Sequence, residues 1–299
     1  MHNKKISIIV SMVLGILLLA GCTSSFQADV ESYMASMDDV HVLDSEYDEK
    51  MSQLEIGDLP ETLSPRNEEI DMERLASLIE TLDEEIMPIV SEMKEAVAGI
   101  EVSNEELAEI HESYLESLEL KGTFVQQLSD YTETYYMSVR SNESLIQLSQ
   151  TFMENQEERD AVIDSISDEA ETEEMDAIVT QINENSTALE EEAEMLQQDE
   201  SRAEKMEHID EVMLPLINEH IQSLNEMNLE TDKGVRVRSL TLEMYYGFEK
   251  YYEERKNTMQ YNEQLQELQL QNILPLRETY QQLDQEYYDQ LNEIESELS

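Results

Sequence analysis

Apolar residues recur along most of this chain at alternating steps of three and four, the spacing of a helix face packed lengthwise on other helices. The runs cover residues 75–100, 107–146, 175–227 and 270–298. Glycine and proline, which interrupt helices, number only 7 and 5 in 299 residues. Together these features predict an all-α protein whose long helices pack side by side, in a coiled-coil or spectrin-like manner.

Polar stretches separate the apolar runs and predict where helices end. They lie at residues 57–65, 99–104, 165–172 and 229–234. The first closes an N-terminal helix of residues 26–56, and the second leads into a capping box, Ser103–Glu106. The three later helices would each have about 60 residues, or about 90 Å at 1.5 Å per residue. We therefore expect an elongated antiparallel bundle of three to four long helices.

One short string occurs twice. Asp83–Val90 and Asp210–Ile217 have similar sequences, 127 residues apart, and each carries a proline. Duplication of a helical hairpin would explain the match, although amphipathic helices also match by chance. Because proline removes a helical hydrogen bond, we expect kinks at Pro88 and Pro215, and a third at Pro275.

The N-terminus has the form of a secretory signal. Lys4 and Lys5 precede an almost unbroken apolar run from Ile6 to Leu19, which is short for a membrane-spanning helix. Leu19, Ala20 and Gly21 then lead to Cys22, the single cysteine of the chain. This ending resembles a bacterial lipobox, which implies that Cys22 is acylated with diacylglycerol and becomes the mature N-terminus.

The lipobox, followed by long Glu- and Gln-rich helices with scattered tyrosines, resembles a family of cell-wall binding lipoproteins from Gram-positive bacteria. The resemblance implies an elongated, spectrin-like helical bundle outside the cell, and it implies no catalytic residues. It predicts residues 1–21 as signal peptide, 22–65 as a lipidated N-terminus with a short helix and a break, and 66–299 as the bundle. The protein would then lie at the cell membrane, lipid-anchored on its extracytoplasmic face.

The charge restricts the partners. The chain has 70 acidic and 18 basic residues, a net charge of −52. Such a surface excludes nucleic acid as a partner, because phosphate binding needs basic residues. It also disfavours broad contact with anionic lipid, so an acyl anchor would supply the membrane affinity. Cations would bind weakly and diffusely to the abundant carboxylates.

The residues contain no pattern typical of catalysis. No histidine pair has the helical spacing of a zinc site, and the chain lacks both a Gly-rich phosphate loop and a nucleophile elbow. We therefore expect no catalytic residues, no metal site, no cofactor and no enzyme activity. The distinctive remaining feature is clustered tyrosine. Tyr245, Tyr246, Tyr251 and Tyr252 would form an aromatic contact stripe for glycan or a partner helix, or else they pack at the edge of the core.

These observations favour a non-enzymatic, lipid-anchored helical protein of the cell envelope. It would act as a spacer, an adaptor or a binding protein for cell-wall glycan or an envelope protein. The alternatives are a solute-binding lipoprotein, which would need sheets that the sequence does not predict, and a chaperone-like binder that uses its Met-rich faces to capture a peptide.

The acidic excess predicts that salt stabilises the fold. Folding brings like charges together along several helices, and the screening length falls to about 3 Å at 1 M salt. A thermal melt of the domain that follows Cys22 should show a higher melting temperature in ~1 M than in ~0.05 M sodium chloride. An unchanged or lower melting temperature would mean that ion pairs, rather than repulsion, dominate the electrostatics.

Overall fold

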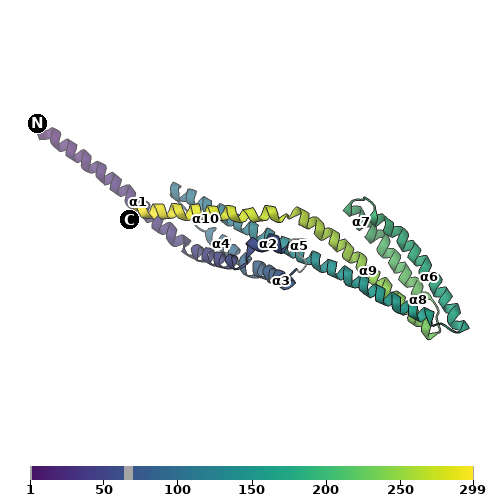
Figure 1. Ribbon diagram of the computed structural model, residues 1–299. Helices are drawn as coiled ribbons and strands as arrows, with labels where there is room; N and C mark the ends of the chain where they lie inside the picture. Colours follow the sequence, from purple (N-terminus) through teal and green to yellow (C-terminus); the bar gives the residue numbers. More distant parts are fainter. Residues whose placement is uncertain (1, 64–69, 299) are drawn as a thin grey trace. The chain divides into compact units, whose positions relative to one another are not determined.

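The computed structural model describes residues 2–63 and 70–298, and every regular element among them is helical (Figure 1). This confirms the predicted all-α class. The chain divides into two compact units. Unit 1 comprises the chain up to Glu133 together with Leu268 onwards, and unit 2 comprises Thr134–Glu267.

Unit 1 is built from four helical segments. They are α1 (His2–Gln53), the run of α3 (Met72–Glu80), π-helical η2 (Thr81–Ile86) and α4 (Met87–Val97), the first part of α5 (Glu105–Asp164), and α10 (Leu270–Leu298). Two short pieces, η1 (Ile56–Asp58) and α2 (Leu59–Thr62), follow α1. Helix α1 packs against η2 and α4, and its described buried residues extend from Val30 to Met51. The expected boundary at residue 65 therefore falls inside unit 1.

Unit 2 is built from a similar set of helices. It contains α6 (Glu169–Ala193), the run of α7 (Arg202–His208), π-helical η4 (Ile209–Met213) and α8 (Leu214–Glu226), then α9 (Asp232–Glu267) and the second part of α5. Its main core joins Leu189 of α6 to Ile217 of α8 and Tyr245 of α9. A smaller cluster around Ile178 and Val237 closes the end of the unit near the turn before α6.

The prediction of one continuous helix through residues 175–227 was wrong. The chain leaves helix α6 through a 3-10 turn, η3 (Glu194–Gln197), and Gln198 takes an extended conformation. Ser201 then caps α7 through a full capping box with Glu204. This cap satisfies free backbone N–H groups at the start of α7, so the polar stretch at 198–201 breaks the helix. The break lets Leu196 pack beside Ile209 in the same core.

Helix α5 does run unbroken for 60 residues, as expected. The last predicted long helix, in contrast, ends at Glu267 and restarts at Leu270. The helix expected after residues 99–104 begins at Glu105, but its cap differs from the predicted box. Asn104, rather than Ser103, accepts hydrogen bonds from the backbone N–H groups of Glu106 and Leu107.

The prolines of the repeated string change the local helix type. Pro88 and Pro215 each occupy one of the first two positions of an α-helix that follows a π-helical turn, η2 or η4. A wider π turn accommodates a residue that has no N–H and whose ring would clash with the carbonyl four residues back. Around Pro275 the helix α10 continues from Leu270 to Leu298 without such a turn.

The two copies of the string share more than this turn. Helices α5 and α9, which follow them, begin at Glu105 and Asp232, again 127 residues apart. In each unit the order is one long helix, a helix–π–helix segment and a second long helix. The structural match along this stretch supports duplication over chance as the origin of the repeat.

A buried ion cluster joins three helices of unit 1. The ammonium group of Lys121 on α5 is fully buried and donates to Asp44 of α1 and, at 2.9 Å, to Asp284 of α10. Tyr288 donates to the second oxygen of Asp44 at 2.8 Å, and Ser117 donates to Asp284 at 2.5 Å. Burial acts to lower the pKa of Lys121, but the two carboxylates outweigh it and raise that pKa.

Tyrosine rings enclose this cluster. The Lys121 Nζ atom lies 5.4 Å from the centre of the Tyr47 ring and 5.9 Å from those of Tyr114 and Tyr280. Burial raises the pKa of each of these three phenols, so they remain neutral in the core. The rings exclude water and attract the ammonium group through their faces, which makes the ion pairs stronger than exposed ones.

We expect Lys121→Met to destabilise unit 1 strongly, because Asp44 and Asp284 would remain buried without a cation. Breaking a buried pair in this way costs about 3–5 kcal/mol. Urea unfolding should show this loss, whereas Lys250→Met, at an exposed position, should change the stability little. The triple variant Lys121→Met/Asp44→Leu/Asp284→Leu should recover part of the loss, and no recovery would mean that the packing of the lysine chain matters more than its charge.

Candidate functional site

The predicted lipidation segment lies near the start of helix α1. Leu19, Ala20, Gly21 and Cys22 fall within its bounds, but their side chains lie outside the part of the structure that can be described. Modification of Cys22 therefore stays a prediction. Among the described residues, no helix combines the length and the apolar character that crossing a bilayer requires.

The four tyrosines predicted as a contact stripe are divided between core and surface. Tyr245 and Tyr252 are buried, with 3% and 8% of their surfaces exposed. Tyr246 is 47% exposed, and Tyr251 is half-buried beside the surface. Adjacent residues on a helix point in different directions, so one member of each pair faces the core. Only Tyr246 and Tyr251 remain available for contact with a ligand or partner.

Tyr245 organises the core on its side of α9. Its ring meets His220 of α8 edge-on at 5.7 Å between centroids, and lies 6.0 Å from Phe248. Burial raises the pKa of Tyr245, against smaller opposing effects of a hydrogen bond with Asn185 and of the charge on Arg159. The Nη1 atom of Arg159, from α5, contacts the sulfur of the preceding residue, Met244, at 3.8 Å.

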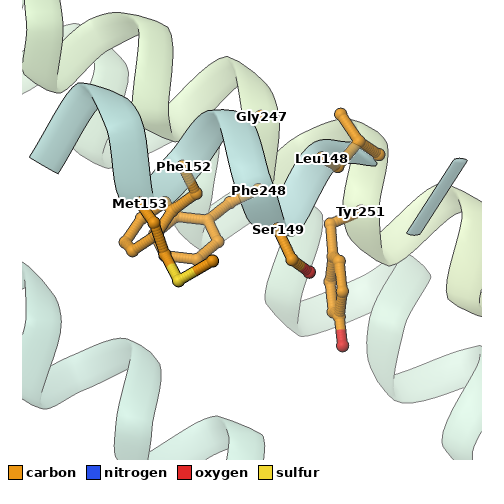
Figure 2. Close-up of a pocket in the computed structure, with 7 residues that line it drawn as sticks. All are labelled: Leu148, Ser149, Phe152, Met153, Gly247, Phe248 and Tyr251. Atoms are coloured by element: carbon orange, nitrogen blue, oxygen red, sulfur yellow. The ribbon is translucent and has the colours of Figure 1, made fainter. Parts of the chain in front are cut away.

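Next to Met244 and Tyr245, the surface of unit 2 has an apolar hollow of about 340 Å³. Its walls come from Leu148, Ser149, Phe152 and Met153 on α5 and from Gly247, Phe248 and Tyr251 on α9 (Figure 2). The centroids of the Phe152 and Phe248 rings are 4.7 Å apart. The Tyr251 ring stands beside Ser149, with its hydroxyl pointing away from the helices.

A second, polar hollow of about 190 Å³ adjoins the first and shares Phe152 and Phe248 with it. Its other walls include Arg159, Asn183 and Ser186, together with Met244 and Tyr245 of α9. Only 13% of the Arg159 side chain is exposed, and its Nε and Nη2 atoms donate to Asp160. The two hollows therefore place aromatic rings beside one shielded cation.

No local sequence pattern marked Phe152, Phe248 or Arg159 as site residues. A signal was available, since the chain has only 4 phenylalanines and two of them meet here. The small number of phenylalanines does not identify this contact, however, because helical spacing alone does not show that residues 152 and 248 lie on facing helices. Arg159 looked like one of many charged residues on a solvated face.

The carboxylates do not assemble into a metal centre in the part of the chain that the structure describes. A third hollow, in unit 1, is lined by Glu106 and Glu109 of α5 and by Glu293 and Glu297 of α10. It matches the expectation of abundant surface carboxylates and contains no histidine or cysteine that would fix a cation.

His220 makes the Tyr245 core sensitive to acid. Burial lowers the pKa of His220, against a weaker opposing effect of Glu219. The folded protein therefore favours neutral His220, and unfolding takes up a proton below the ordinary histidine pKa of about 6.5. As the pH falls through that value, this residue should subtract from stability.

Lowering the pH from about 7.5 to about 5.5 should reduce the melting temperature of the wild-type protein more than that of the His220→Gln variant. An NMR titration of the His220 ring should give a pKa below the ordinary value. A raised pKa, or equal pH dependence in the variant, would contradict the burial argument.

Comparison with known proteins supports a lipoprotein identity and leaves the Gram-positive cell-wall binding family without direct support. Residues 3–295 match a family described as EMYY-motif containing lipoprotein. The string Glu-Met-Tyr-Tyr occurs in this chain at Glu243–Tyr246, the segment that supplies Tyr245 to the core and Tyr246 to the surface. No curated protein and no solved structure matched the chain. The match spans nearly the whole sequence, and the chain belongs to the EMYY-motif containing lipoprotein family.

Proposed function

We propose that this protein is a non-enzymatic binding protein held on the extracytoplasmic face of the cell membrane by diacylglycerol on Cys22. One observation carries the proposal: a chain that belongs to a lipoprotein family has its single cysteine directly after Leu19-Ala20-Gly21 and an apolar run. Two acyl chains give stable anchoring, at roughly 0.8 kcal/mol per buried methylene, where one chain gives only marginal binding.

The environment of the histidines supports a role without catalysis. His41 bonds to the Tyr287 hydroxyl at 2.8 Å, and His111 lies 3.2 Å from the Tyr33 hydroxyl. His220 packs on Tyr245, and His208 lies 3.0 Å from the carbonyl oxygen of Glu192. Each of these four rings, the histidines whose side chains the structure describes, thus has a structural partner within its own unit. A general base needs instead an open approach to a substrate.

The surface of unit 2 supports a role in binding. Ile146 and Met153 on α5 are 59% and 55% exposed, and Tyr246 on α9 is 47% exposed. Exposed apolar residues beside a hollow mark contact sites for partners or ligands. Cell-wall glycan or another envelope protein would then be held at the membrane, with the protein as adaptor or spacer.

The hollows next to the EMYY segment favour a second candidate, capture of a small ligand. Together they offer an apolar surface and a few polar groups, the usual make-up of a small-molecule site. This function uses the same anchor, and differs from the first in what the surface of unit 2 holds.

We expect Cys22→Ser to abolish lipid attachment. The wild-type protein should partition into the detergent phase of a Triton X-114 extraction and show a diacylglycerol-modified N-terminal cysteine by mass spectrometry. The variant should keep its signal or appear in the aqueous phase, whereas Ser24→Ala, two residues away, should behave as wild type. A mature protein with unmodified Cys22 would overturn the anchor.

A further inference from the structure

The two hollows beside the EMYY segment differ in chemistry but share one wall. Phe152 and Phe248, with ring centroids 4.7 Å apart, line both of them. On one side lie the apolar side chains of Leu148 and Met153, with the Tyr251 ring (Figure 2). On the other side lies Arg159 among amides and hydroxyls. A ligand that contacts both hollows must therefore be apolar at one end and polar at the other.

Arg159 decides the charge of the polar end. Its Nε and Nη2 atoms both donate to a single oxygen of Asp160, at 3.0 and 2.9 Å. Among the described residues, the remaining Nη1 group has one hydrogen-bond contact, with the sulfur of Met244, a weak acceptor, at 3.8 Å. This leaves donor capacity in a guanidinium group that is largely shielded from water. Such a group binds a carboxylate through a charge-assisted hydrogen bond, about twice as strong as a neutral one.

The aromatic wall decides the chemistry of the apolar end. Phe152, Phe248 and Tyr251 present rings to the hollow, and rings stack with other rings beyond the gain from buried area alone. Gly247 adds room, because a Cβ atom at this position would meet nothing within 4 Å. The space next to the rings is therefore open to a planar group.

We propose that the two hollows form one binding site for a small aromatic carboxylate. Its ring lies against Phe152 and Phe248, and its carboxylate accepts a hydrogen bond from Nη1 of Arg159. The proposal rests on the proposed function as a binding protein and names the ligand class of that function. The EMYY segment then serves the site by placing Met244 and Tyr245 behind the arginine.

The test uses the full-length protein in lipid nanodiscs, with empty nanodiscs to subtract partition into lipid. The probes are 1-naphthylacetate and its neutral amide, 1-naphthylacetamide, which share the ring system and differ in charge. Titration calorimetry should show the carboxylate binding about tenfold or more tightly than the amide. Equal affinities for the two probes, or no binding of the carboxylate, would overturn the proposal.

Two charge variants on α5 locate the anionic end. Arg159→Gln should remove the preference for the carboxylate and leave the affinity for the amide unchanged. Arg140→Gln removes the same charge from the same helix and unit at an exposed position, and should keep the preference. Loss of the preference in both variants would show a general charge effect and contradict the site.

Two variants of Gly247 locate the aromatic end without removing any packed side chain. Gly247→Leu should fill the apolar hollow and abolish binding of both probes, while Gly247→Ala should retain most of it. Both residues favour helix over glycine, so circular dichroism should show an intact fold. Unchanged binding in a folded Gly247→Leu protein would place the probe elsewhere and refute the proposal. None of these variants changes Cys22, and the detergent partition of the same protein reports lipid attachment separately, so failure of ligand binding is distinguishable from failure of the Cys22 anchor.

Discussion

The fold depends on narrow lines of buried apolar and tyrosine side chains that hold helices together against repulsion among carboxylates. With 70 acidic and 18 basic residues, most acids have no basic partner to neutralise them. The helices place those acids outward and commit Leu, Ile, Met and Tyr to the interior, where 44 hydrophobic side chains are buried among those that the structure describes. Because each helix offers only one such face, a single buried residue stabilises two or three helices at once.

Two of the few basic residues stabilise contacts between segments that are separate in the sequence. Lys121 joins α1, α5 and α10 within unit 1, and Lys233 caps the turn before α6 by donating to Glu171 and to the carbonyl of Ser165. A buried ion pair is costly to desolvate, so it contributes less to net stability than to the register of the helices that supply it. In unit 1 it aligns three segments that lie far apart in the sequence.

The fold class could be predicted from the sequence because the spacing of apolar residues directly indicates the buried face of each helix. The polar stretches at residues 99–104 and 165–172 also located the starts of α5 and α6, which Asn104 and Asp168 cap. The break at residues 198–201 was not predicted, because the three- and four-residue spacing of apolar residues continues on both sides of this polar turn. The Ser201–Glu204 capping box is the local feature that indicates the break. The π turns before Pro88 and Pro215 were expected only as kinks, since proline predicts disturbance but not its form.

The binding surface was harder to predict. The sequence did not show which of Tyr245 and Tyr246 is buried, because adjacent residues differ only by a rotation about the helix axis. Arg159 and Phe152 belong to the surface through their contacts with Met244 and Phe248, residues about 90 positions later. Such pairings arise from tertiary packing, and no local pattern encodes them.

Helix α1 runs without interruption from His2 to Gln53, and Val30 is the first buried residue among its described side chains, which begin at residue 26. With an anchor on Cys22, Val30 would lie only about 12 Å along the helix from the anchor, at 1.5 Å per residue. Tension between membrane and envelope would then pass along a stiff helix straight into unit 1. Asp44, further along α1, would bear part of that load through its bond to Lys121. The buried ion pair would thus resist mechanical extraction of the helix.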